Sequence, residues 1–371
     1  MGTERTSSGR PGLLGAFSFA SGPLAWVYGR GVARRNRAFD AGRGVVTFDR
    51  PVISVGNLSV GGTGKTPMVM HLLTLLRSLG RSPCVAMRGY APSGGESDEA
   101  REYRDAFPDV TVVARADRVG GLLELFAAEA GRKIDAVVLD DGFQHRAIAR
   151  DLDIVLIDAT RPPFGDSLLP KGWLREPPAA LARAHAAVIT HAESVPAPTV
   201  NDIRVKALAV NPSLVVDVAR HAWSGFRTRG GGEDRDLPPN AVAGKRVAAA
   251  CAIGNPQPFF QMVAHAARTA PQPAIALRDH DPYDDDTVAA LIKRVRAVAP
   301  HALIVTEKDW VKLRRVKDDA WGCPVLRPRL AMTFDGGGAA LARAIEDTLA
   351  RHAAASAADE ADTDDAADGD E

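Results

Sequence analysis

The chain has 371 residues, and its 46 Lys and Arg balance its 46 Asp and Glu, so the formal net charge is zero. A content of 46% hydrophobic and 25% charged residues is typical of a soluble globular protein, and the length predicts two domains. The charge balance gives no support for a nucleic-acid partner. The cysteines Cys84, Cys251 and Cys323 are far apart, which excludes a disulfide framework or a zinc ribbon. No stretch reaches the roughly 18 apolar residues of a conventional membrane span.

Residues 1–45 contain an uncharged apolar stretch over 11–28, and a run of arginines over 30–37 follows it. A secretory signal has the reverse order, with its positive charge first. Trp26 and Tyr28 stand at the junction, which suits a segment that lies in a membrane surface with its arginines on anionic phosphates. A helix that covers the core with a solvated basic face fits the composition equally well.

Residues 46–195 alternate short apolar runs with helical or loop segments, which is typical of a parallel sheet covered on both faces. The first run is 51–55, and apolar residues at helical spacing predict a helix over 67–79. Further strands are expected at Cys84–Met87, Val110–Val113, Ala136–Leu139, Ile154–Ile157 and Ala186–Ile189. The fold class is therefore α/β.

The remaining segments differ in character. Residues 196–245 are rich in Pro, Gly and charge, and strand-like pieces at Ile203–Val210 and Leu214–Ala219 predict a two-strand linker or hairpin. A smaller α/β domain is expected over 246–350, with strands at 247–254 and 302–306 and helices around 259–268 and 287–298. The strongly acidic tail over 351–371 is expected to be disordered.

The strongest local motif is a phosphate-binding loop between the strand at 51–55 and the helix that follows. Its residues are Ser59, Val60, Gly61, Gly62, Thr63, Gly64, Lys65 and Thr66. Backbone N–H groups at such a turn cradle phosphates. Lys65 would reach the β- and γ-phosphates of ATP, and Thr66 would bind Mg²⁺. A P-loop domain of the RecA-like type is therefore predicted over 46–195.

Two carboxylates, Asp140 and Asp141, follow directly after the strand at Ala136–Leu139. In a sheet that carries a P-loop, this position is suited to hold Mg²⁺. A simple turn around Gly142 is the other interpretation.

The loop by itself leaves the reaction open. Partition-type ATPases have a Lys just before the paired glycines, where this chain has Val60. A GTPase needs an Asn-Lys-x-Asp segment, and the nearest string, Thr306-Glu307-Lys308-Asp309, lacks the Asn-Lys pair. A membrane-acting ATPase of the partition or assembly type stays as the alternative to a kinase, and a nucleotide-binding recruitment module without catalysis as another.

Several strings together resemble the tetraacyldisaccharide 4′-kinase (lipid A 4′-kinase) family. They occur in that family's order over about residues 13–330: the block from Val52 to Pro67, Arg88-Gly89-Tyr90, Ser97-Asp98-Glu99, Asp140 to His145, Leu169-Pro170, Leu174 to Pro177, Gly254-Asn255-Pro256, Asp279-His280 and Val305 to Asp309.

The resemblance implies ATP-dependent phosphorylation of the 4′-hydroxyl of a tetraacylated glucosamine disaccharide 1-phosphate. It places this reaction at the cytoplasmic face of the inner membrane of a Gram-negative bacterium. It also favours the membrane-surface interpretation of the N-terminal segment, with the protein held as a peripheral or monotopic enzyme.

Roles for individual residues are implied by the same resemblance. Asp98 would be the general base on the sugar hydroxyl, His280 would work with it, and Arg118 and Arg175 would neutralise phosphate charge. The other polar residues of the site are also implied by the resemblance. Those expected to hold Mg²⁺ are Thr66, Asp140, Asp141, Glu99 and Gln144, and the further site residues are His145 and Glu176. Asp98 and His280, in different domains, are expected to meet when a cleft closes over the substrate and excludes water.

Taken singly, these residues have simpler explanations. Asp98 and His280 both lie in charged stretches that suit solvated loops or turns. Arg175 and Glu176 suit a surface ion pair, and Trp173 suits either the core or a lipid contact.

Overall fold

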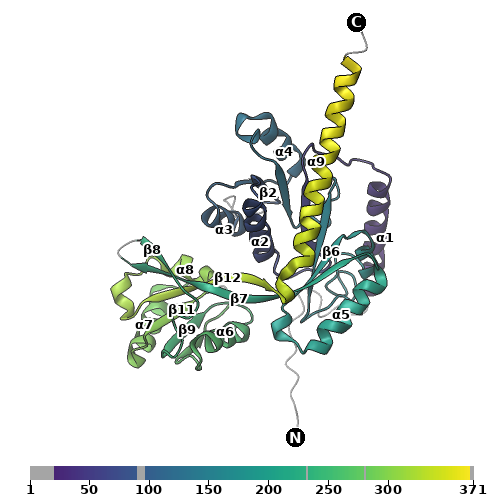
Figure 1. Cartoon of the computed structure of the whole chain (residues 1–371). Coiled ribbons are helices and arrows are strands. Elements are labelled where there is room, and N and C mark those ends of the chain that lie inside the picture. The colour runs from purple at the N-terminus through teal and green to yellow at the C-terminus, as the bar shows by residue number, and fades with distance from the viewer. Residues whose placement is uncertain (1–20, 90–96, 231–232, 280, 368–371) are drawn as a thin grey trace. The chain divides into compact units, whose positions relative to one another are not determined.

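The computed structural model describes residues 21–89, 97–230, 233–279 and 281–367, and within them it leaves out the side chains of Asp98, Gly230 and 356–367. The chain divides into two compact units, one of Met1–Arg220 with Thr333–Glu371 and one of His221–Met332. It passes between them within the strands β7 and β12 (Figure 1).

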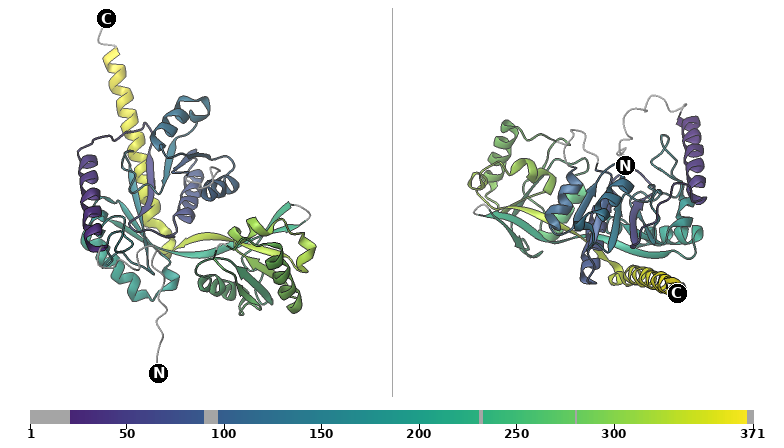
Figure 2. Two further views of the ribbon diagram at one scale, coloured as in Figure 1. Left: turned by 180° about the vertical axis from the view of Figure 1, so that it is seen from behind. Right: turned by 90° about the horizontal axis from the view of Figure 1, so that it is seen from above.

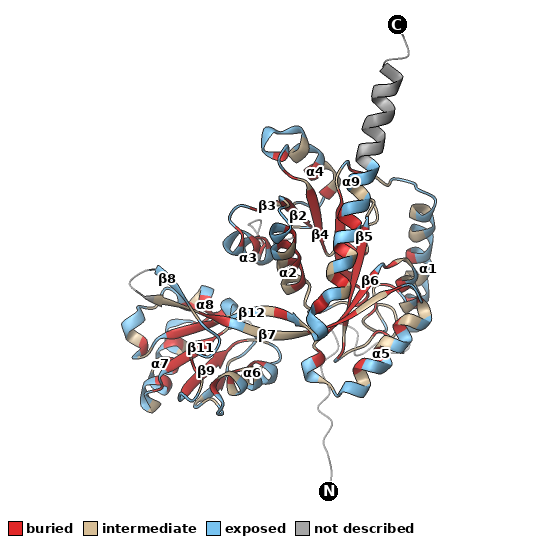
Figure 3. Ribbon diagram, viewed as in Figure 1, coloured by how far each residue is buried: buried red, intermediate tan, exposed pale blue. Residues whose placement is uncertain are grey.

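The first unit is built on a parallel sheet with the strand order β7-β6-β5-β1-β4-β2-β3. The bounds are β1 (Val52–Asn57), β2 (Pro83–Met87), β3 (Thr111–Ala114), β4 (Ala136–Asp140), β5 (Leu152–Asp158), β6 (Ala186–Thr190) and β7 (Val215–Gly230). β1, β2, β4 and β6 are buried along their whole length (Figure 3). Strands buried on both faces explain the uninterrupted apolar runs in the sequence and confirm the predicted α/β fold.

Helices cover both faces of this sheet. Their bounds are α1 (Ser21–Asp40), α2 (Lys65–Ser78), α3 (Asp98–Ala106), α4 (Arg118–Ala127), α5 (Ala197–Val210) and α9 (Ala339–Ala367), and short 3₁₀ turns lie at Glu129–Gly131, Pro178–Arg183, Ala192–Ser194 and Asp335–Gly338. α2 contacts β1 and β4, α4 contacts β2 and β3, and α5 contacts β6. α1 and α9 lie on opposite sides of the sheet (Figure 2). None of the helices in the described ranges is both long and apolar enough to span a bilayer.

The parallel sheet gathers functional groups at one edge, because the carboxyl ends of parallel strands lie together. In the ladder, Val55 of β1 pairs with Asp140 at the end of β4. On the other side of β1, Asp158 at the end of β5 pairs with Thr190 at the end of β6. The loop that follows β1 therefore lies between an acidic strand end and a second polar strand end.

The second unit has its own α/β core. Its elements are β8 (Glu233–Leu237), β9 (Val247–Cys251), α6 (Gln257–Ala267), β10 (Ala274–Ala276), α7 (Asp285–Val298), β11 (Ala302–Val305), α8 (Glu307–Leu313), a 3₁₀ turn at Asp318–Trp321 and β12 (Val325–Phe334). The strands β10, β9, β11 and β12 are parallel, and β8 pairs antiparallel with β7. Trp321, Tyr283 and Phe226 are among its fully buried side chains.

The structure corrects the interpretation of Ile203–Val210 as a strand, because this stretch is the second half of α5. The buried residues Val200, Ile203 and Ala207 recur at helical spacing, and Pro196 directly precedes the helix. Ile203 therefore lies on the buried stripe of a helix, whereas Val205 of the same stretch is exposed.

The chain ends also differ from the expectation. Residues 333–350 belong to the first unit rather than to a second domain over 246–350, because Leu341, Ile345 and Leu349 of α9 are buried there and α9 contacts β5. The acidic segment from 351 is helical as far as Ala367 rather than disordered. Its many alanines have the highest helix propensity, and the helix extends one that is already anchored.

Candidate active site

The phosphate-binding loop connects β1 to α2 and takes a conformation that requires glycine at two positions. Gly61 has φ 120° and Gly64, directly before Lys65, has φ 86°, values that L side chains rarely adopt. The loop is held by two hydrogen bonds from outside: Val60 N donates to Trp173 O at 2.8 Å, and Thr190 Oγ1 donates to Thr63 O at 2.9 Å. The amides at the start of α2 form a ready anion site.

Asp140, the last residue of β4, is buried and offers a free oxygen. The Tyr103 hydroxyl donates to Asp140 Oδ2 at 3.1 Å, whereas Asp140 Oδ1 is buried and has no hydrogen-bond partner among the described residues. Burial raises the pKa of Asp140, against the opposing effects of Lys65 and the Tyr103 hydrogen bond. A buried carboxylate oxygen without a partner is costly, so this atom fits a cation ligand.

Asp141, the next residue, is surrounded by three cations. Arg175 Nη1 lies 2.7 Å from Asp141 Oδ2 and 3.0 Å from Oδ1, and Lys65 Nζ lies 3.6 Å from Oδ1. Arg118 Nη1 donates to the backbone carbonyl of Asp141 at 3.1 Å. Burial disfavours the ionised carboxyl, but Lys65 and Arg175 outweigh burial and hold the pKa of Asp141 below its usual value.

Gln144 and His145 complete this side of the site. Gln144 Nε2 donates to Asn57 O at 2.9 Å, and its Oε1 lies 3.4 Å from Arg175 Nη1. Burial, with Arg118 and Arg150 as further causes, lowers the pKa of His145 to about 4. The imidazole is therefore neutral at neutral pH.

Glu176 lies behind the site. It is fully buried, and its carboxylate accepts from Arg183 at 2.8 Å and from Asn36 Nδ2 of α1 at 2.6 Å. In addition, the Tyr28 hydroxyl of α1 donates to Arg175 O at 3.1 Å. These contacts attach α1 to the loop that carries Arg175.

The described residues of the site offer oxygen ligands of the kind that Mg²⁺ prefers. Among them no cluster of three His, Cys, Asp or Glu could hold a metal by itself. Mg²⁺ usually takes one or two carboxylates and completes its shell with water and substrate phosphates. Asp140 with its buried Oδ1 matches this chemistry better than Asp141, whose oxygens already face cations.

Of the other predicted site residues, Glu99 is described and does not belong to this cluster, whereas the side chains of Asp98 and His280 are not described. Glu99 is exposed in the first turn of α3. Asp98 begins α3, which Ser97 caps by accepting from Ala100 N at 3.2 Å, but the Asp98 side chain lies outside the described residues. His280 also lies outside them.

Two residues of the site escaped the sequence analysis. Tyr103 is fully buried, and nothing in its charged helix indicated a contact with a residue 37 positions later. Asn57 is also fully buried, and neither its Nδ2 nor its Oδ1 has a partner in the described part of the chain. Its position two residues before the loop, within the block from Val52 to Pro67, was the signal that the sequence offered.

Comparisons with known proteins agree with this geometry. A family model described as tetraacyldisaccharide-1-P 4′-kinase matches residues 18–349. The tetraacyldisaccharide 4′-kinase of Geobacter metallireducens is 36% identical over 304 residues, which cover 76% of this chain and 85% of that protein. The enzyme of the same name from Syntrophobacter fumaroxidans is 39% identical over 281 residues, 71% of each chain. The crystal structure of LpxK from Aquifex aeolicus in complex with ATP superposes with a TM-score of 0.65 at 26% identity, covering 88% of this chain and 98% of that one.

Proposed function

Because this chain belongs to the tetraacyldisaccharide-1-P 4′-kinase family and is an ATP-dependent lipid A 4′-kinase, we propose that phosphoryl transfer is centred on Lys65, Asp140 and Asp141. The observation that carries this proposal is the convergence of Lys65, Arg118 and Arg175 on Asp141 beside the phosphate-binding loop. An ATPase of the partition or assembly type is not favoured by the family.

The nucleotide side of the site uses the loop and its neighbours. The amides of 59–66 and Lys65 bind the phosphates of ATP. Thr66 and Asp140 would hold Mg²⁺, which neutralises phosphate charge when bound. Lys65, Arg118 and Arg175 keep spare N–H groups and supply positive charge where negative charge spreads in the transition state.

On the acceptor side of the site, Asp98 is the proposed general base. Its carboxylate takes the proton of the sugar 4′-hydroxyl while that oxygen attacks the γ-phosphorus, ADP leaves, and the product is the 4′-phosphate. The cap by Ser97 fixes the backbone of Asp98 at the start of α3. His280 is the second candidate for moving this proton.

The lipid substrate and the membrane surface are proposed partners, and α1 supports them. Leu24, Trp26 and Val27 are 49%, 63% and 59% exposed, although they are large and apolar. Arg30 lies over the Trp26 ring at 4.8 Å from its centroid. The Tyr28 and Asn36 contacts hold α1 on the protein, so the exposed side chains can enter the interface of the inner membrane at its cytoplasmic face.

The test is transfer of labelled γ-phosphate from ATP to tetraacyldisaccharide 1-phosphate in detergent micelles. The unmodified protein is expected to give the 4′-phosphorylated lipid, and Asp98→Asn to lower the rate by roughly 10²-fold or more while ATP binding persists. Asp105→Asn is the matched control, because Asp105 is an exposed carboxylate on the same helix. An unchanged rate in Asp98→Asn removes the base assignment alone, whereas no lipid product from a folded, ATP-binding protein overturns the kinase.

A further inference from the structure

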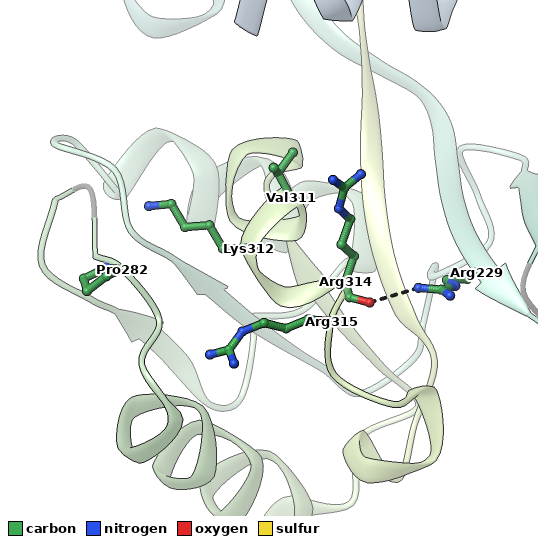
Figure 4. A pocket seen from close by; sticks show the side chains of 6 residues that line it. All are labelled: Arg229, Pro282, Val311, Lys312, Arg314 and Arg315. Carbon is green, nitrogen blue, oxygen red and sulfur yellow. Dashed lines mark hydrogen bonds between the residues drawn. The ribbon is translucent and has the colours of Figure 1, made fainter. Parts of the chain in front are cut away.

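A hollow of about 660 Å³ in the unit His221–Met332 is lined mainly by positive side chains. Its lining residues are Arg229, Pro282, Val311, Lys312, Arg314 and Arg315 (Figure 4). Val311 and Lys312 come from α8, Arg314 and Arg315 from the turn after it, and Arg229 from β7. None of these residues belongs to the phosphoryl-transfer site.

The hydrogen bonds of these cations leave their charges uncompensated, because most of the acceptors are backbone carbonyls. Arg229 Nη1 donates to Arg314 O at 2.9 Å, as Figure 4 shows, and Lys312 Nζ donates to the Asp281 carbonyl at 2.5 Å. Arg315 donates to a carbonyl and also pairs with Asp285 at 2.8 Å, but that carboxylate is 91% exposed. An ion pair this exposed contributes little.

Arg314 is the most available of the four. It is exposed, and its guanidinium has no hydrogen bond or ion pair with the part of the chain that the structure describes. Like charges that line one hollow repel each other, and an anion relieves this repulsion. Guanidinium and ammonium groups together are the usual protein partners of phosphate.

The hollow also has an apolar wall. Val311 is 42% exposed and points the same way as Arg314 (Figure 4), and Pro282 is exposed as well. An apolar wall beside cations suits a ligand with a phosphate and a hydrocarbon part, so a lipid head group fits better than a free phosphate compound.

We propose that this hollow binds the phosphate group of an anionic ligand, either a lipid head group or a free phosphate compound. This contact is separate from α1 and from the phosphate-binding loop, so it does not depend on the roles proposed for either.

The experiment uses the full chain with Arg314→Glu, and with Arg294→Glu as the control. Arg294 is an exposed arginine on α7 in the same unit and does not line the hollow. One arm measures co-sedimentation with phosphatidylcholine vesicles with and without phosphatidylglycerol, and the other measures calorimetric titration with pyrophosphate, both at low salt. Melting temperatures of both variants check that they fold.

Each basic residue near an anionic surface contributes about 1 kcal/mol, so reversing one charge is expected to weaken binding on the order of tenfold. A loss specific to Arg314→Glu in the phosphatidylglycerol arm identifies a lipid head group, and one in the pyrophosphate arm identifies a free phosphate compound. α1 and the phosphate-binding loop are the same in both variants, so their contributions to binding cancel when the two variants are compared. The proposal is overturned when Arg314→Glu and Arg294→Glu behave alike in both arms, whatever the kinase assay shows.

Discussion

One guanidinium nitrogen of Arg175 contacts both carboxylate oxygens of Asp141, at 2.7 and 3.0 Å. Arg175 follows Leu174, whose backbone pairs with Ser59 of the phosphate-binding loop, and Arg175 N donates to Leu58 O at 2.7 Å. The same segment therefore shapes the loop and delivers a cation to it. This double attachment explains how a residue more than a hundred positions away in sequence becomes part of the nucleotide site.

Arg175→Ala is expected to lower kcat by roughly 10²–10³-fold with a much smaller change in the KM for ATP, because the lost charge acts mainly in the transition state. Steady-state kinetics at saturating lipid measure this effect. Arg132→Ala is the control, since Arg132 is an exposed arginine of the same unit with no side-chain contact to the site. A rise in KM with kcat unchanged would assign Arg175 to ground-state binding instead.

Tyr103→Phe is expected to reduce stability by about 1.5–3 kcal/mol, because it removes the hydroxyl that donates to the buried carboxylate of Asp140. That hydrogen bond lowers the pKa of Asp140, so its loss moves the acid limb of the pH–rate profile to higher pH. Urea denaturation and kcat/KM against pH measure the two effects. Tyr28→Phe is the control, because it also deletes a hydroxyl near the site and should leave the acid limb of the pH–rate profile unchanged. If Tyr103→Phe does not move the acid limb either, Asp140 is not the essential carboxylate.

The pair of His191 and Asp158 predicts a defined pH window for stability. Nδ1 of His191 lies 3.1 Å from Asp158 Oδ1. Burial opposes both charges, but the pairing outweighs it, raises the pKa of His191 above 6.5 and lowers that of Asp158 below 3.8. The pair's contribution is therefore fully present between pH 3.8 and pH 6.5; it is lost as pH rises through the raised pKa of His191 or falls through the lowered pKa of Asp158.

Asp158→Asn tests this window. The difference in free energy of unfolding between the protein and the variant should be largest inside the window and shrink above the pKa of His191. An NMR titration of the His191 imidazole should show its pKa falling in the variant, since burial is then opposed only by the smaller effect of Glu193. A difference that grows with rising pH would contradict the pairing.

Simultaneous substitution of Leu24, Trp26 and Val27 by Ser is expected to weaken binding to anionic vesicles by roughly 10²-fold or more, because burial of each apolar side chain contributes about 1.5–3 kcal/mol. Vesicle co-sedimentation measures this loss, and transfer in detergent micelles should fall less. Leu123→Ser with Val205→Ser is the control, since both are exposed apolar residues on other helices of the same unit. An equal loss of vesicle binding in the two variants would mean that α1 does not contact the membrane more than other exposed apolar residues do.

The fold was largely predictable because its signals are local. Strands stand at all six positions predicted over 51–189, and α2 begins two residues before the predicted start, since Lys65 and Thr66 already have helical geometry. The mistake at Ile203–Val210 has a local cause as well. Val and Ala suit a strand or a buried helix face, and the sheet against which α5 packs decided between them.

The site was predictable only in part. Short motifs in a fixed strand–turn–helix context predicted Lys65, Thr66 and the acidic pair Asp140 and Asp141. Tyr103 and Asn57 have no such motif, and their roles follow from burial and from partners that the sequence does not reveal.

The sequence by itself determined the α/β class, the phosphate-binding loop and the acidic strand end, because strand and helix periodicity and glycine-dependent turns act between residues a few positions apart. Only the tertiary structure decided that Asp141 faces three cations while Asp140 keeps a buried oxygen without a partner, and that Glu176 is a buried anchor for α1. These arrangements depend on which strands are neighbours and on how far each carboxylate is withdrawn from water. Strand order and burial are properties of the folded chain, so no local pattern encodes them.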